Sequence, residues 1–446
     1  MTSDSQKTRF RYRIFSMVVL LALINYIDRG AMSYGASHIT GEYHLDKGDW
    51  GAVLGYFGYG YMFGALSGGM LADRFGPRRV WIIAGTAWSL FEIATAWAGD
   101  FGLAVLGGSA LAGFAMIRIL FGAAEGPAYS IINKTIANWA TLRERGFVVG
   151  FGLLSTPLGA LLTAPVAVGL LTLTDNWRAM FLVLGAAGLI VLVFFMRIFT
   201  DCPEDNPRVS KAELDEIVAS RPQAAAEQAG APVLPWWSFF RCKALVFNTL
   251  GYFAFLYVNF LLLTWTPKYL QDNFGYSLSS LWYIGMIPWT GACVTVLLGG
   301  RFSDWLFKRT GKLRIARSWF AAACLLATTL CFVMVSQAQS VVAVIALMTL
   351  ANAFNSLPNS VFWAVVIDTA PTNRVGTFSG LMHFIANIAS ILAPTLTGYL
   401  VTGHGYSAMF IAAAVATVIG MLAMLLVRPG VGPRMSGLAQ PVGVSQ

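Results

Sequence analysis

Charged residues are scarce in this chain of 446 residues, since Asp, Glu, Lys and Arg make up 11% of it and hydrophobic residues 57%. A soluble protein of ordinary composition carries roughly twice that density of charge. Apolar stretches recur from end to end, each near the roughly 20 residues that cross a bilayer as a helix. The composition therefore argues against a soluble globular protein and predicts a polytopic membrane protein with the lipid bilayer as its surroundings.

Clusters of reactive or metal-binding side chains are also missing. The five cysteines and four histidines are scattered, with neither the spacing of a metal site nor that of a disulfide framework. No nucleophile elbow and no phosphate-binding glycine loop occurs. The sequence therefore predicts no metal and no cofactor, and the chain is not expected to be an enzyme.

Basic residues are unevenly distributed, although the net charge of +9 alone would be compatible with nucleic-acid binding. Loops such as "DRFGPRR" and "FKRTGKLR" alternate with loops nearly free of Lys and Arg, where only Lys47, Arg178 and Lys268 fall. This is the positive-inside pattern of membrane proteins. It predicts cytoplasmic N- and C-termini in a bacterial inner membrane and no nucleic-acid partner.

Twelve apolar segments are predicted to cross the membrane, with boundaries uncertain by a few residues. They are residues 13–35, 50–72, 79–98, 108–133, 146–171, 179–199, 244–267, 278–300, 315–336, 340–367, 377–402 and 407–427.

The longest loop divides these spans six and six. The predicted parts are an N-terminal bundle (1–199), a cytoplasmic central loop (200–243), a C-terminal bundle (244–428) and a cytoplasmic tail (429–446). Within the loop, Ser210 and Glu213 have the spacing of a capping box, so a short solvated helix is expected to start there.

The two halves of the chain resemble each other weakly. "GGMLADRFGPRR" follows the second span and "GGRFSDWLFKRTGK" follows the eighth, so a glycine pair, an aspartate and a basic cluster recur at the same relative position. Such recurrence is typical of an internal duplication. The predicted fold is all-α, with two pseudo-symmetric six-helix bundles around a central cavity.

The segment "GGMLADRFGPRR" resembles the signature loop of the major facilitator superfamily of secondary transporters. "NYIDRG", "RILFGAAEGPAY", "SKAEL" and "TWTPKYL" together resemble the anion:cation symporter family, which includes proton-coupled carriers of hexuronates, galactonate, glucarate and other organic anions. "DFGLAVLGGSALAG", between the third and fourth spans, is longer than the connection usual in that family.

A few ionisable residues lie within the predicted spans: Asp28, Arg29, Glu92, Arg118 and Glu125. Asp or Arg at the centre of a membrane helix costs about 2.5–3.5 kcal/mol, so such residues commonly mark a substrate or ion pathway. Arg29 is predicted to bind the substrate's carboxylate, because a guanidinium can form two parallel hydrogen bonds with it. The alternative is that Arg29 only neutralises Asp28, although adjacent helix residues point about 100° apart.

Asp28 and Glu125 are the candidates for carrying a coupled proton, and the resemblance supports this role for Glu125. Protonation of either would release Arg29 from an internal partner and favour anion binding. Fixed structural ion pairs are the alternative. Arg118 lies two helical turns before Glu125 on the same face and either influences Glu125 or holds the helix against its neighbours. Glu92 is left without an assigned role.

A polyhydroxylated substrate also needs neutral donors, acceptors and aromatic faces. Core packing or lipid contact is the alternative for any one aromatic residue, and His383 departs from the asparagine that the resemblance implies. The residues in spans that the resemblance places around the cavity are Tyr26, Tyr61, Asn133, Thr156, Trp363, His383 and Asn387.

The residues after the second and eighth spans resemble a cytoplasmic gate whose weak ion pairs hold the outward-facing form closed. They are Asp73, Arg74, Arg78, Arg79 and Asp304.

The sequence therefore predicts a monomeric carrier that imports a small organic anion, such as a hexuronate or aldonate, together with protons. Three alternatives remain: transport of an aromatic acid or a tartrate-like diacid, proton-exchange export, and a membrane receptor that does not transport its solute.

Overall fold

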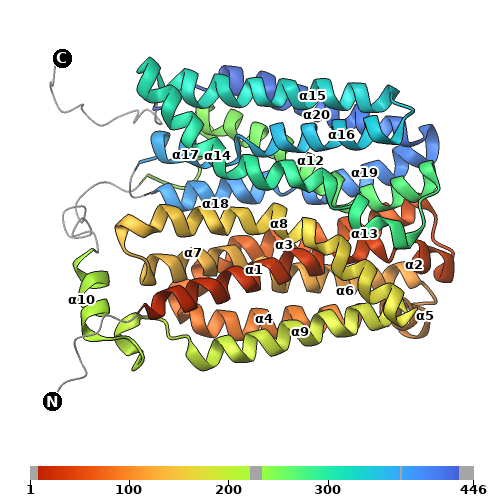
Figure 1. Cartoon of the computed structure of the whole chain (residues 1–446), viewed down its shortest axis with the longest axis horizontal. Helices are drawn as coiled ribbons and strands as arrows, with labels where there is room; N and C mark the ends of the chain where they lie inside the picture. Colours follow the sequence, from red (N-terminus) through yellow and green to blue (C-terminus); the bar gives the residue numbers. More distant parts are fainter. Residues whose placement is uncertain (1–8, 221–233, 372–373, 431–446) are drawn as a thin grey trace.

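The computed structural model describes residues 9–220, 234–371 and 374–430. Within these ranges the regular structure is helical, and the long helices lie side by side with their axes roughly parallel (Figure 1). The predicted all-α membrane fold is confirmed. Helix α10 and the two ends of the described chain, the start of α1 and the end of α20, lie at one end of the bundle, and α2, α5 and α13 lie at the other (Figure 1).

The first half of the chain contributes nine helices within the described residues. They are α1 (Phe10–Tyr34), α2 (Ala36–Tyr43), α3 (Lys47–Phe75), α4 (Pro77–Thr95), α5 (Ala98–Val105), α6 (Ala110–Glu125), α7 (Ala128–Trp139), α8 (Leu142–Thr174) and α9 (Trp177–Ile198). The connecting region follows with η1 (Pro203–Asp205), α10 (Lys211–Ala219) and α11 (Ser238–Arg241).

The second half repeats this pattern of long and broken helices. Its elements are α12 (Lys243–Phe274), η3 (Leu278–Ser280), α13 (Leu281–Ile284), α14 (Ile287–Thr310), η4 (Ile315–Trp319), α15 (Phe320–Gln337), α16 (Val341–Ser356), α17 (Asn359–Thr369), α18 (Val375–Ala386), α19 (Ala389–His404) and α20 (Tyr406–Leu426).

Ten helical segments in the described part are long and apolar enough to cross a membrane, and the pair α4–α5 raises the number to eleven. The two helices of this pair meet at 75°, and the break at residues 96–97 falls at the end of the third predicted span, 79–98. The long segment after it is partly helical, as α5. The remaining predicted span is α3, whose 29 residues extend about 44 Å. Its many glycines lower its hydropathy.

Two membrane helices are interrupted at corresponding places in the two halves. The α6–α7 interruption falls at Gly126 and Pro127, and the α16–α17 interruption at Leu357 and Pro358. Proline has no backbone N–H and cannot continue the hydrogen-bond ladder of a helix interior. This recurrence supports the predicted duplication and places Glu125, the last residue of α6, at a helix end in the middle of the bundle.

The two halves touch closely through α3 and α19. A Cβ atom on Gly51 would lie 2.7 Å from the Pro394 carbonyl oxygen and 2.9 Å from the Gly398 Cα. Gly55 and Gly58 face the same helix one and two turns further along α3. Small residues at this spacing let two helix backbones approach in a membrane. The halves are therefore in contact at the end of the bundle opposite the chain ends.

The short helix α10 begins as predicted, because the Ser210 hydroxyl accepts a hydrogen bond from the Glu213 backbone N–H at 3.3 Å. Its expected solvation is wrong at Glu213, which is fully buried. The Glu213 carboxylate accepts hydrogen bonds from the backbone N–H groups of Phe10 and Arg11, both at 3.0 Å. These N–H groups belong to the first turn of α1 and have no partner within the helix. Glu213 thus attaches α10 to the start of the first span.

Candidate functional site

Arg29 is buried in the C-terminal half of α1, with 4% of its surface exposed. Its Nη2 lies 3.4 Å from Glu125 Oε1 and donates a hydrogen bond to Asn25 Oδ1, also at 3.4 Å. Neither Glu125 oxygen accepts a well-aligned hydrogen bond from the protein. The ion pair between α1 and α6 is therefore close enough for strong attraction but is not a tight bidentate pair.

Asp28 points to a different neighbour. Its Oδ2 accepts a hydrogen bond of 2.8 Å from Trp88 Nε1 on α4, and the residue is fully buried. Consecutive residues on a helix point about 100° apart, which directs Asp28 to α4 and Arg29 to α6. The interpretation that Arg29 only neutralises its sequence neighbour is therefore not supported by the geometry.

Aromatic rings surround the Arg29 guanidinium. Its Cζ lies 4.5 Å from the ring centre of Tyr61, 4.6 Å from that of Tyr26 and 4.9 Å from that of Phe57. Phe260 of the second half is 5.9 Å away. Cations this close to ring centres are stabilised by the negative faces of the rings. The site therefore holds a positive charge where the two halves of the chain meet.

The second half adds an aromatic and imidazole cluster. The Tyr252 hydroxyl lies 3.3 Å from His383 Nδ1, and the rings of Trp363 and His383 are 5.6 Å apart. Tyr61 joins this cluster across the interface, with 6.4 Å between its ring centre and that of His383. The structure thus brings together Tyr61, Trp363 and His383 from the predicted set, and adds Tyr252.

Tyr129 on α7 is a further residue that the sequence analysis missed. Its hydroxyl lies 3.1 Å from Thr156 Oγ1 and 3.4 Å from Ser155 Oγ, and its ring is 6.2 Å from that of Tyr26. Its place in the sequence, four residues after Glu125 and just past the break at Gly126 and Pro127, was the available signal. Tyr129 therefore contacts both Thr156 and Tyr26 and connects them.

The two predicted asparagines are placed differently from the aromatic cluster. Asn133 is exposed on α7. Asn387 is buried at the end of α18, where its side-chain amide donates a hydrogen bond of 2.7 Å to the His383 carbonyl oxygen. One donor of Asn387 is therefore already used within its own segment.

Arg118 and Glu92 extend the buried charge behind Arg29. The Arg118 guanidinium carbon is 5.2 Å from the ring centres of both Phe57 and Phe121. Glu92 is fully buried, its carboxylate oxygens have no hydrogen-bond partner in the protein, and it interacts electrostatically with Asp28, Arg118 and Glu125. Glu92, which had no assigned role, therefore belongs to the same charged network.

The network consists of three carboxyl groups and two guanidinium groups. If all five groups were ionised, the site would carry one negative charge. Burial disfavours an uncompensated charge, because the interior cannot solvate it as water does. The composition of the site is therefore suited to holding one exchangeable proton.

The predicted gate residues make contacts within their own halves. Lys134 Nζ lies 2.8 Å from Asp73 Oδ1, and Arg317 Nη1 lies 3.0 Å from Asp304 Oδ1. Arg78 donates a hydrogen bond of 2.9 Å to the Met196 carbonyl oxygen. Two further predicted gate residues are exposed: Arg74 and Arg79.

A helical bundle of membrane length, with buried charges where its two halves meet, defines a polytopic membrane protein of the solute-carrier kind. The comparisons with known proteins agree. The chain belongs to the Major Facilitator Superfamily, whose family model matches residues 18–394 and 310–441.

The chain is similar to the "Hexuronate transporter" of Bacillus subtilis, with 31% identity over 423 residues that cover 94% of this chain and 95% of the relative. It is 28% identical over 435 residues to the "Probable galactarate/D-glucarate transporter GudP" of Escherichia coli K12, with 95% of each chain covered. A bacterial homologue of the human lysosomal transporter Spinster has a similar fold, with a TM-score of 0.75 at 16% identity over 95% of this chain and 98% of that one. The protein is therefore a membrane transporter and not an enzyme, and the resemblance seen in its motifs is confirmed.

Proposed function

We propose that the protein is a secondary active transporter that carries a sugar acid, such as a hexuronate or aldonate, together with a proton. The observation that carries this proposal is the Arg29 guanidinium, which is held among aromatic rings between the halves and paired at 3.4 Å with a carboxylate. The names of the similar transporters, which specify hexuronate and galactarate or D-glucarate, support a sugar acid.

Arg29 binds the carboxylate of the substrate in this proposal. A guanidinium presents two parallel N–H donors to a carboxylate and stays charged at every working pH. Tyr26 and Tyr61 cover the C–H faces of the sugar acid, and their hydroxyls hydrogen-bond its oxygens. The second half contributes rings and polar groups for the same contacts with the sugar acid, from Trp363, His383 and Tyr252.

Glu125 and Asp28 handle the proton. Glu125 occupies the position beside Arg29 that a substrate carboxylate would need, so protonating Glu125 frees the guanidinium for the substrate. Proton and anion then each raise the affinity for the other, as reciprocity of binding requires. Asp28, Glu92 and Arg118 complete the network and supply a place for the proton while Glu125 is paired.

Transport proceeds by rocking of the two halves, residues 1–199 and 244–428, around this site. The tight α3–α19 contact closes the end opposite the chain ends, which the positive-inside pattern assigns to the periplasm of a bacterial inner membrane. The protein is then inward-facing, with the termini in the cytoplasm. In the outward-facing state, Asp73, the arginines near it and Asp304 would close the cytoplasmic end. One chain contains the whole pathway, so a monomer is sufficient. Residues 221–233 of the central loop and the tail beyond residue 430 lie outside the described residues.

A different carboxylate is the second candidate for the substrate, and His383 favours it. The imidazole lies beside Trp363 and Tyr252, where a second acidic group or an aromatic ring of the substrate would be accommodated. A tartrate-like diacid or an aromatic acid would use these contacts, while Arg29 would still bind the first carboxylate.

The test is uptake of radiolabelled D-glucuronate, D-galactonate, galactarate, tartrate and benzoate by proteoliposomes with an imposed pH gradient. We expect accumulation of a sugar acid that requires an acidic exterior and disappears when a proton ionophore collapses the gradient. Arg29→Gln should abolish it, whereas Lys211→Gln, an exposed change on α10, should not. Accumulation that ignores the pH gradient would refute proton coupling, and uptake that survives Arg29→Gln would refute the assigned anion site.

A further inference from the structure

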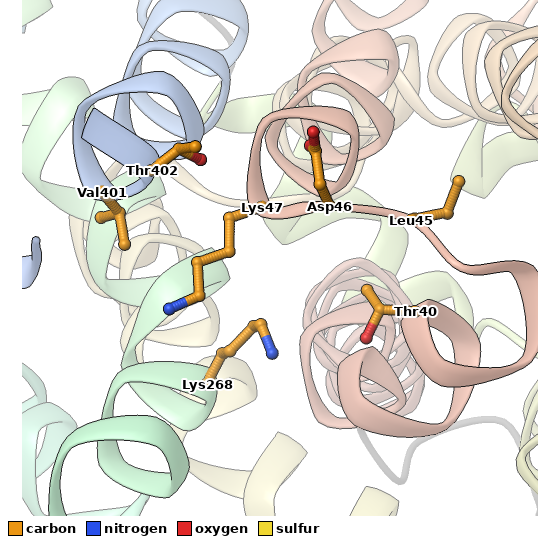
Figure 2. A pocket seen from close by; sticks show the side chains of 7 residues that line it. All are labelled: Thr40, Leu45, Asp46, Lys47, Lys268, Val401 and Thr402. Carbon is orange, nitrogen blue, oxygen red and sulfur yellow. The ribbon is translucent and has the colours of Figure 1, made fainter.

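A second cluster of charged residues lies at the end of the bundle opposite the chain ends, around a pocket of about 440 Å³. Figure 2 shows that the Lys47 and Lys268 ammonium groups point into the same gap, whereas the Asp46 carboxylate points toward α3. The pocket lies between the two halves, since Lys47 begins α3 and Lys268 belongs to α12. The lining residues are Thr40, Leu45, Asp46, Lys47, Lys268, Val401 and Thr402.

The Asp272 carboxylate forms ion pairs with both lysines. Its Oδ2 lies 3.2 Å from Lys47 Nζ and its Oδ1 lies 3.4 Å from Lys268 Nζ. The Tyr406 hydroxyl also donates a hydrogen bond of 2.7 Å to Asp272 Oδ2. Asp272 is therefore shared between two cations, one from each half of the chain.

The other carboxylate of the pocket, that of Asp46, caps a helix. Asp46 Oδ1 accepts a hydrogen bond of 2.7 Å from the Asp49 backbone N–H, in a capping box at the start of α3. There it compensates the positive end of the helix dipole. Lys268 is only 8% exposed, so water screens its charge poorly. The two ammonium groups of the pocket therefore share one paired carboxylate, that of Asp272, while the Asp46 carboxylate is held at the start of α3.

Few other cations are available to an anion arriving at this end. Of the three basic residues that the sequence places there, Arg178 pairs with Glu42 and lies 3.1 Å from Asp100. Lys47 and Lys268 are therefore the basic residues of this end that an incoming carboxylate would meet first.

We propose that this pocket is a second anion-binding site, in which a carboxylate of the organic anion binds Lys47 and Lys268 in competition with Asp272. The inference rests on the proposed function for the identity of the anion. The Lys47–Asp272 pair joins the two halves, as does the hydrogen bond of 2.9 Å from the Ser37 hydroxyl to Gln271 Oε1. A carboxylate that takes the place of Asp272 therefore weakens the closure of this end and favours its opening.

The test uses the full chain carrying Thr402→Cys, a conservative change at an exposed position of the pocket. The rate of modification by a membrane-impermeant, negatively charged methanethiosulfonate is measured on purified protein in nanodiscs, with D-glucuronate as the competing probe. The chain without Thr402→Cys gives the background from its own cysteines. All measurements are repeated in an Arg29→Gln background, so that the probe cannot act through the central site.

We expect D-glucuronate to slow the modification at least threefold in both backgrounds. Lys268→Gln should raise the half-protecting concentration at least fivefold, and the matched change Lys211→Gln should leave it unaltered. Asp272→Asn should lower it two- to fivefold, because it removes the competing carboxylate but keeps an oxygen acceptor for Tyr406.

Three results would overturn the inference. The first is no protection by D-glucuronate at concentrations that saturate transport. The second is protection that Lys268→Gln leaves unchanged, which would make the lysines a gate alone. The third is protection that vanishes with Arg29→Gln, which would trace it to the central site and leave the proposed function standing. Conversely, transport that survives Arg29→Gln would refute the central site without affecting the outer one.

Discussion

Replacing Glu125 by glutamine is the sharpest perturbation of the proposed coupling, because it removes the carboxylate that competes with substrate for Arg29. At 3.4 Å and an effective dielectric constant of about 20, two unit charges attract with about 5 kcal/mol. Desolvation opposes this attraction, and the pair lacks an aligned hydrogen bond. A net value of about 1.5–3 kcal/mol, well below the bare attraction, is therefore expected.

Glu125→Gln should consequently bind D-glucuronate about ten- to a hundredfold more tightly than the unmodified protein at pH 7.5, since about 1.4 kcal/mol corresponds to a factor of ten. The unmodified protein should gain affinity between pH 7.5 and 5.5, as Glu125 is protonated and releases Arg29. The variant should show equal affinity at both pH values. Calorimetric titration of the protein in nanodiscs measures both quantities.

Asp28→Asn provides the comparison within the same site. The asparagine oxygen can still accept the hydrogen bond from Trp88 Nε1, so the packing of α1 against α4 is retained. This variant should keep pH-dependent binding, and Lys211→Gln, at an exposed position on α10, should behave like the unmodified protein. In proteoliposomes, Glu125→Gln should exchange D-glucuronate but fail to accumulate it. A Glu125→Gln variant whose binding keeps its pH dependence would refute the reasoning, as would loss of that dependence in Asp28→Asn.

Three other predictions follow from the packing. Arg29→Lys keeps the charge but loses the paired donors, so the KM for D-glucuronate should rise about tenfold or more in uptake assays; an unchanged KM would contradict carboxylate binding by the guanidinium. Burial favours the neutral form of Glu144, but hydrogen bonds from Arg11, Tyr12 and Thr141 outweigh it and lower the pKa of Glu144 to about 2. The ionised Glu144 carboxylate therefore stabilises the folded state above about pH 4.3, and this stabilisation is lost as the pH falls toward 2. Thermal unfolding of Glu144→Gln should show a melting temperature lower by roughly 1–3 °C at pH 7, with a smaller deficit at pH 3; an equal deficit at both would be inconsistent with this ion pair. Gly51→Ala should impair uptake at least tenfold because its Cβ would meet the backbone of α19, whereas Gly41→Ala, with open space around it, should transport normally; equal activity of the two would show that the α3–α19 contact is dispensable.

Much of the architecture could be predicted because its signals are local in the sequence. Hydropathy over about 20 residues locates most membrane helices. Charged residues inside such segments stand out as costly wherever they pack, which is why Asp28, Arg29, Arg118 and Glu125 could be identified. The glycine pair, aspartate and basic cluster recurring after the second and eighth spans indicated two related halves.

Other features depended on which side chains meet, and the sequence did not contain this information in local form. Asp28 and Trp88 are 60 residues apart, and Tyr252 and His383 are 131 residues apart. The burial of Glu213 depends on the free N–H groups of α1, more than 200 residues earlier in the chain. The bend between α4 and α5 was also missed, because both of its arms are apolar.

The order of the residues alone is enough to predict a helical membrane protein with a repeated pattern and a few buried charges, because hydrophobicity acts residue by residue. The packing of the folded helices was needed to learn that Arg29 pairs with Glu125 and that Asp28 accepts a hydrogen bond from Trp88 instead. The same is true of Asp272, which lies between lysines from the two halves. Such pairings depend on the rotation and crossing of packed helices, which side-chain packing over the whole bundle fixes.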